Sequence, residues 1–102
     1  MKKYTLRYLP IAQQDLQEIV TYIKDILKNP IAAENTLSKI EIAILERLEF
    51  PESFAVWQSK KPRDYPYRRI NVGNYSVWYV VIDDVMEIRR VLYSRRDSED
   101  LI

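Results

Sequence analysis

At 102 residues the chain is long enough for one domain (residues 1–102) with its own hydrophobic core, and its 47% hydrophobic and 30% charged residues are typical of a globular protein. It contains no cysteine and no histidine, which excludes disulfides and thiolate metal sites and removes the commonest general base. We therefore expect no metal and no cofactor. With no apolar run of about 18 residues and no signal or lipidation motif, we expect a cytoplasmic protein without membrane contact.

The first half of the chain predicts one strand followed by a helical hairpin. Residues 2–9 alternate between apolar and polar side chains, and Pro10 ends this strand and suits the first turn of a helix. Apolar residues then recur every three or four positions through about Lys28, and Asn29-Pro30 marks the start of a second helix that runs to about Glu49. The apolar stripes are Ala12, Leu16, Ile19, Val20, Ile23 and Leu27 in the first helix, and Ala33, Leu37, Ile40, Ile44 and Leu48 in the second. We interpret both as packing faces of the hairpin rather than as a cofactor or membrane site.

Residues 50–66 predict a long loop. The segment holds three of the five prolines and shows no clean period. A loop of this length is usually functional or anchored by its own side chains, and Phe50, Phe54 and Trp57 are the expected anchors.

Residues 67–93 predict a three-stranded antiparallel meander, with strands over 67–72, 75–82 and 85–93. They are rich in valine, isoleucine, tyrosine and tryptophan, which suit a pleated, half-buried surface. Gly73-Asn74, which contains the chain's one glycine, predicts a type II′ hairpin turn, and Asp83-Asp84 predicts a second tight turn. The complete prediction is an α+β fold made of an N-terminal strand, a helical hairpin and this meander.

The two turns fix which strand residues face each other, and therefore which face each side chain occupies. The first turn pairs Val72 with Tyr75, Ile70 with Val77 and Arg69 with Trp78. The second pairs Ile82 with Val85, Val80 with Glu87, Trp78 with Arg89 and Ser76 with Val91. The predicted core face carries Ile70, Val72, Tyr75, Val77, Tyr79, Val81, Met86, Ile88 and Leu92. The opposite face, polar and aromatic, is the candidate site and carries Tyr67, Arg69, Asn71, Ser76, Trp78, Val80, Glu87, Arg89, Val91 and Tyr93.

Basic residues are concentrated in the second half of the chain although the net charge is only +1. Between Lys60 and Arg96 there are nine lysines and arginines against four acidic residues. A solvated sheet surface would explain any one of them. As a set beside Trp78 and Tyr67, they favour an anionic or acidic partner.

This chain resembles the RelE/ParE family of type II toxin–antitoxin toxins over nearly its whole length. The motifs that carry the resemblance are Ala12-Gln13-Gln14-Asp15-Leu16 with Ile19 and Tyr22-Ile23, Tyr67-Arg68, Val72-Gly73-Asn74-Tyr75, and Ile88-x-Arg90-Val91-Leu92-Tyr93 followed by Arg96-Asp97. The resemblance implies helices packed on one face of a twisted antiparallel sheet, with the N-terminal strand beside the meander.

The family has two activities, and both remain open at this point. Its RelE-like branch cleaves mRNA on the ribosome without metal, whereas its ParE-like branch poisons DNA gyrase. If the chain is such a ribonuclease, the resemblance assigns catalysis to Arg69, Arg95, Tyr67 and Tyr93. Ser76 stands where the nuclease branch usually carries an arginine, and a hydroxyl cannot stabilise the charge that in-line attack builds on a phosphate. The sequence is therefore closer to the ParE-like branch, in which the protein is a binding toxin rather than an enzyme.

For the gyrase-binding alternative, the expected target-binding residues are Arg69, Trp78, Arg89, Arg95 and Arg96. The tail over residues 94–102 lies outside the meander, so we expect it to contribute to binding and to be dispensable for folding; Leu101 and Ile102 either tuck back or stay free. The resemblance implies a cognate antitoxin as partner, with DNA gyrase, or the ribosome and mRNA, as target. A toxin fold that has lost its toxicity is a third alternative.

Overall fold

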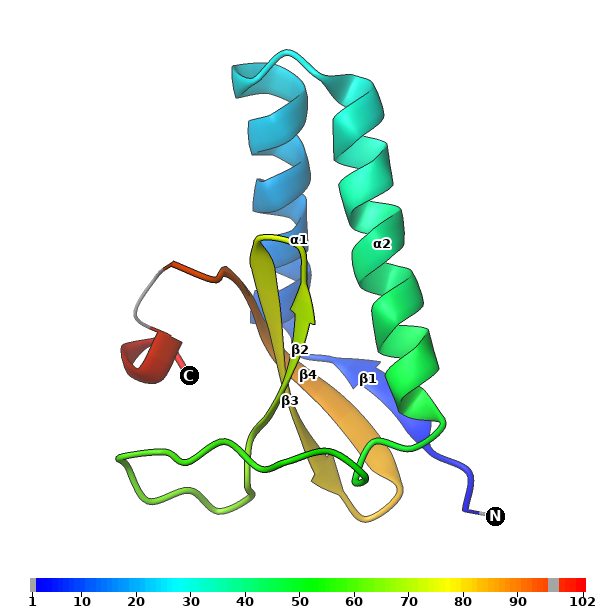
Figure 1. The fold of residues 1–102 in the computed structure, drawn as a ribbon, viewed down its shortest axis with the longest axis vertical. Helices are drawn as coiled ribbons and strands as arrows, with labels where there is room; N and C mark the ends of the chain where they lie inside the picture. The colour runs from blue at the N-terminus through cyan, green and yellow to red at the C-terminus, as the bar shows by residue number, and fades with distance from the viewer. Residues whose placement is uncertain (1, 96–97) are drawn as a thin grey trace.

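The computed structural model describes residues 2–95 and 98–102, and its element order confirms the predicted α+β fold (Figure 1). The elements, in chain order, are β1 (Thr5–Tyr8), α1 (Pro10–Thr21), the π-helical turn η1 (Tyr22–Ile26), α2 (Pro30–Leu48), β2 (Arg68–Val72), β3 (Tyr75–Ile82), β4 (Val85–Tyr93) and the short 3-10 helix η2 (Ser98–Asp100).

The helical hairpin begins and turns at the residues that the sequence indicates. Pro10 opens α1, and the side chain of Asn29 caps α2 by accepting a hydrogen bond of 3.1 Å from the backbone N–H of Ala32. The first helix is α-helical only to Thr21 and continues as the π turn η1. Lys28, at φ 57°, then takes the left-handed conformation that ends a helix.

The four strands form one sheet in the order β1-β4-β3-β2, with β1 parallel to β4 and the remaining pairs antiparallel. The predicted pairing across the first turn is confirmed, because Val72 faces Tyr75, Ile70 faces Val77 and Arg69 faces Trp78. Gly73 has φ 56°, the left-handed value that a II′ turn requires at this position. The implied position of the N-terminal strand beside the meander is confirmed as well.

The predicted pairing of β3 with β4 is correct near the second turn and wrong beyond it. Ile82 faces Val85 and Val80 faces Glu87 as expected, but a β-bulge lies between Trp78 and Tyr79. Trp78 therefore faces Arg90 instead of Arg89, and Ser76 faces Leu92 instead of Val91. One extra residue reverses the alternation of the side chains that follow it. As a result Val91 and Leu92 exchange the faces that the sequence predicts for them.

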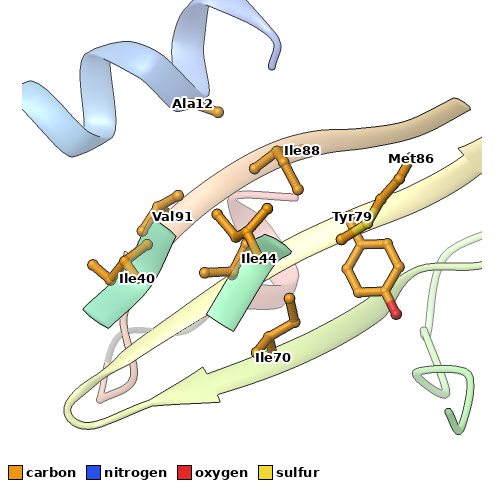
Figure 2. Close-up of a cluster of buried hydrophobic side chains, with 9 residues drawn as sticks. Ala12, Ile40, Ile44, Ile70, Tyr79, Met86, Ile88 and Val91 are labelled. Carbon is orange, nitrogen blue, oxygen red and sulfur yellow. The ribbon is translucent and has the colours of Figure 1, made fainter. Parts of the chain in front are cut away.

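The main core lies between the helical hairpin and one face of the sheet (Figure 2). Ile70, Val77, Tyr79 and Ile88 are buried there, as predicted, and Val91 joins them because of the bulge. From the helices, Ala12, Ile40 and Ile44 reach the same cluster and are fully buried. This layer of apolar contacts fixes the hairpin on the sheet and leaves the opposite face for other segments.

The opposite face is covered rather than open, which contradicts the predicted polar surface. Tyr67, Trp78, Val80 and Leu92 form a second buried cluster on this face. The side chains packed over it come from the long loop, the end of β3 and the chain's last residues: Trp57, Ile82, Leu101 and Ile102. Among the described residues, no helix is long and apolar enough to cross a membrane.

Candidate target-binding surface

Trp78, the centre of the predicted site, is 1% exposed and therefore not a surface residue. Its ring meets that of Trp57 edge to face, with centroids 5.0 Å apart. Within the described parts of the chain its indole Nε1 has no hydrogen-bond partner. The prediction that it lies on the face away from the helices is correct, whereas the prediction of an exposed aromatic side chain is wrong.

The long loop and the C-terminal tail are joined over this face by the carboxylate of Glu99. The carboxylate accepts hydrogen bonds from Trp57 Nε1 at 3.0 Å, Ser59 Oγ at 2.7 Å and the backbone N–H of Lys60 at 2.7 Å. These bonds lower the pKa of Glu99 to about 2; the bond from Trp57 has the largest effect and that from Ser59 the next largest. The positive charge of Arg63 nearby acts in the same direction. The tail is therefore fastened to the loop and not free.

Arg89 is held by neighbouring groups of the protein. Its Nε donates to Glu87 at 2.6 Å, and its Nη1 lies 3.3 Å from the hydroxyl of Tyr67. Arg7 pairs with the same buried carboxylate. Burial alone would raise the pKa of Glu87, but hydrogen bonds from Arg7 and Arg89 outweigh it and hold the pKa below its usual value. Glu87 thus stays ionised, and its single negative charge is shared by the two guanidinium groups.

Arg69 is exposed, as predicted, and lies beside a small aromatic hollow. Its guanidinium is 4.9 Å from the ring centroid of Trp57 and 5.4 Å from that of Trp78, distances at which cation–π attraction operates. Arg47 lies across the same cavity of about 280 Å³, stacked 3.5 Å from the ring of Phe54. This pair of arginines with Phe54 and Trp57 forms a cationic and aromatic surface at the β2 edge of the sheet, here called the Arg47–Arg69 surface.

The other predicted site residues are scattered. Tyr67 is buried, with its hydroxyl 3.3 Å from the carbonyl oxygen of Ile102. Tyr93 packs at 5.9 Å against Tyr75 on the helix side of the sheet, so it and Arg69 lie on opposite faces. Arg95 is exposed in the turn after β4, and Arg96 lies outside the described residues. The structure therefore does not bring together the four residues expected for a ribonuclease.

Sequence reasoning missed Arg63 and Glu99 on this face, and it missed Arg47 at the β2 edge of the sheet. Arg47 ends the second helix, far from the meander in sequence, and only its position in the last turn marks it. Trp57 does anchor the loop, as expected, but Phe50 and Phe54 remain about half exposed, at 51% and 50%. Among the described residues, no group of three or more acidic side chains could hold a metal ion.

Several solved structures from toxin–antitoxin systems share this fold of a helical hairpin on one face of a four-stranded sheet. A chain from the "Chromosomal ParDE TA system from P. aeruginosa" superposes with a TM-score of 0.74 at 18% identity, over 88% of this chain and 95% of that one. A chain of "the intact E. coli RelBE toxin-antitoxin complex" superposes with a TM-score of 0.54 at 21% identity, and the match covers 91% of this chain and 99% of that one. The structure of "YafQ from E.coli" superposes with a TM-score of 0.55 at 15% identity, and the match covers 89% of this chain and 93% of that one.

The sequence itself also matches a model of a toxin family. A sequence model of the family described as "ParE toxin of type II toxin-antitoxin system, parDE" matches residues 6–98, and the chain belongs to this family. No curated protein matches the sequence.

Proposed function

We propose that this toxin arrests growth in the cytoplasm by binding DNA gyrase, and that it does not cut mRNA. The observation that carries the proposal is the environment of Ser76. This side chain is 1% exposed, and its Oγ lies 3.0 Å from Ser94 Oγ, in a sheet face filled by the Trp78 cluster. A phosphate group would find no open cleft at this position.

The charges on this face also suit binding better than phosphoryl chemistry. In-line cleavage needs cationic groups aimed at the phosphate and a group that moves a proton. The guanidinium of Arg89 is engaged by Glu87, and that of Arg63 lies 3.7 Å from Glu99. An incoming phosphate would have to compete with a nearby carboxylate for each of these guanidinium groups.

The proposed contact with gyrase is the Arg47–Arg69 surface together with Arg95. Arginine and aromatic side chains are the usual hot spots of protein interfaces, because they bury large areas and retain hydrogen-bonding groups. Trp78 supports this surface from beneath, so its predicted role as a direct contact is replaced by a positioning role. Arg89 and Arg96 stay secondary candidates, the first because it is already paired with Glu87.

The test is a gyrase supercoiling assay run beside a ribosome-dependent mRNA cleavage assay with the same purified protein. We expect inhibition of supercoiling, weakened tenfold or more by Arg69→Ala, since hot-spot truncations cost about 2 kcal/mol or more. Lys24→Ala, an exposed change in the helical hairpin, is the matched control and should leave inhibition unchanged. Ribosome-dependent mRNA cleavage that is lost in Arg69→Ala or Arg95→Ala would instead establish the ribonuclease alternative.

Two variants that the sequence alone would suggest are poor tests. Ser76→Arg would force a guanidinium into a buried position, so a loss of toxicity would report on folding. Deletion of residues 94–102 would uncover part of the buried cluster that contains Tyr67 and Trp78, because Leu101 and Ile102 pack against this cluster. We therefore expect the deletion to lower the stability of the core, contrary to the expectation that the tail is dispensable for folding.

The alternative function, a metal-independent mRNA endoribonuclease, has one observation in its favour. Arg69 and Trp57 together present a cation and an aromatic ring at the surface, and single-stranded nucleic acids bind to such pairs by stacking and charge. The cleavage assay above decides between the two functions.

We also propose a cognate antitoxin as partner, since similar structures from P. aeruginosa and E. coli are described as toxin–antitoxin systems or complexes. Exposed apolar side chains on the outer side of the hairpin, such as Ile31 at 72% and Ile42 at 55%, give a partner helix area to bury. Co-expression of the neighbouring reading frame should relieve growth arrest; equal arrest with and without it would exclude that frame.

A further inference from the structure

A cavity of about 550 Å³ opens between α1 and the paired ends of β3 and β4, apart from the Arg47–Arg69 surface. Three tyrosines from three different elements line it: Tyr22 at the end of the first helix, Tyr75 at the start of β3 and Tyr93 at the end of β4. Glu18 and Asp15 of α1 are its charged lining residues, and no described lysine or arginine lines it. We call the set Glu18, Tyr22, Tyr75 and Tyr93 the tyrosine pocket.

The two carboxylates differ in what they can still bind. Asp15 is neutralised by Arg90, whose Nε and Nη2 donate to it at 2.7 Å and 2.9 Å. Glu18 is exposed and accepts a hydrogen bond of 3.2 Å from the side chain of Gln14, and within the described residues it forms no ion pair. Two carboxylates, Asp15 and Glu18, thus face the single guanidinium of Arg90, and these three described side chains together carry one net negative charge.

The aromatic side chains are arranged for contact with a ligand. Tyr75 and Tyr93 meet edge to face with centroids 5.9 Å apart, while Tyr22 and Tyr93 remain 51% and 39% exposed. Burial raises the pKa of Tyr75, and the neighbouring phenols of Tyr93 and Tyr22 act in the same direction. Aromatic ring faces carry negative potential and attract ammonium and guanidinium groups. The negative charge of Glu18 would instead repel a phosphate or carboxylate.

We propose that the tyrosine pocket binds the cationic head of a lysine or arginine side chain presented by a partner polypeptide. A polypeptide fits better than a free amine because the pocket continues into exposed apolar surface. Leu27, 55% exposed, lines the cavity, and Ile26 beside it in sequence is 66% exposed. Apolar neighbours of the basic residue in a partner segment would bury this surface while the cation enters the pocket.

Peptide titrations of the isotope-labelled full chain, followed by NMR, test this assignment. The probe is Ac-Leu-Arg-Leu-NH2, and the matched peptides carry glutamine or glutamate in place of arginine. We expect the arginine peptide to bind at least fivefold more tightly than the glutamine peptide, with shifts concentrated at Tyr22, Tyr75 and Tyr93. The glutamate peptide should bind most weakly, because it carries the same charge as Glu18.

Variants distinguish binding in the pocket from attraction to the general surface charge of the protein. Glu18→Gln and Tyr22→Leu, both at exposed positions, should each weaken the arginine peptide about fivefold. Their controls are Glu46→Gln and Tyr65→Leu, exposed residues outside the pocket, which should leave affinity unchanged. Equal affinity for the arginine and glutamine peptides, or no effect of Glu18→Gln, would overturn the assignment. Choline tests whether the pocket instead binds a small cationic molecule. Tighter binding of choline than of the arginine peptide would contradict the proposal that the ligand is a polypeptide.

Discussion

Asp15 connects the first helix to the sheet through a single carboxylate. It accepts two hydrogen bonds from Arg90 on β4 and a third, at 3.0 Å, from the backbone N–H of Val91. The side chains of Asp15 and Arg90 are only 8% and 16% exposed. The hydrogen bonds to Asp15 raise the already high pKa of Arg90, so its charge is permanent and needs this partner.

We expect Asp15→Asn to lower the free energy of unfolding by about 3 kcal/mol, because it leaves the guanidinium of Arg90 buried without a compensating charge. Urea denaturation of the purified protein measures the change. Glu18→Gln, one turn further along the same helix and exposed, is the matched control and should change stability by less than about 0.5 kcal/mol. A loss below 1 kcal/mol in Asp15→Asn would show that the pair contributes little.

For single residues, the sequence predicts which face of the sheet a side chain occupies better than it predicts whether other segments cover that side chain. The alternation in residues 67–93 correctly separates Val77 and Tyr79 from Trp78, yet it cannot show that Trp57 and the tail cover Trp78. Arg90 lies among predicted core positions and has no evident partner in the sequence. Its partner Asp15 stands 75 residues earlier, and only the folded chain brings the two together.

At the scale of elements, the least predictable features are the β-bulge and the covering tail. The bulge inserts one residue opposite Trp78 and Tyr79, and no turn residue marks it in the sequence. The consecutive residues Arg89 and Arg90 interrupt the alternation in this strand, as do the apolar pairs Val85-Met86 and Val91-Leu92, and none of them locates the bulge. The tail contributes only Leu101 and Ile102 as apolar residues, too few to indicate whether they pack.

The fastening of the tail to the loop should depend on pH because the pKa of Glu99 is lowered to about 2. A carboxylate whose folded pKa lies below its unfolded value of about 4.5 stabilises the folded contact above that value. We therefore expect the contact to be complete above about pH 4.5 and to be lost as the pH falls towards 2. The NMR signal of the Trp57 indole N–H, which donates to Glu99, reports the opening.

Glu99→Gln should remove this acid transition from the Trp57 signal and weaken the contact already at neutral pH, because a neutral amide accepts hydrogen bonds less strongly than a carboxylate. Asp100→Asn is the matched control: its carboxylate is 74% exposed and lies 3.9 Å from Lys61. If the Trp57 signal of Glu99→Gln titrated between pH 4.5 and 2 as the unchanged protein does, other carboxylates would control the tail.

For the whole molecule, the order of elements could be predicted, but the order of strands in the sheet came only from the family resemblance. The two hairpin turns, which are visible in the sequence, predict that β2 lies beside β3 and β3 beside β4, as they do in the sheet. The place of β1 depends on pairing Thr5 with Val85, across most of the chain, and no local signal specifies such a contact. That pairing puts the first strand at an edge, attached to the sheet on one side.

This topology predicts a gradient of stability that amide hydrogen exchange can measure. β3 lies inside the sheet, and its residues Val77, Tyr79 and Val80 are fully buried, so their amides should exchange only through global unfolding. β1 has four residues with alternate side chains exposed, so its amides should open at a lower free energy and with a smaller urea dependence. The Trp57 amide, which bonds to the carbonyl of Tyr67 at 2.6 Å in the loop, should open more readily than either. Equal exchange free energies and urea slopes for β1 and β3 would show instead that the edge strand unfolds only with the whole domain.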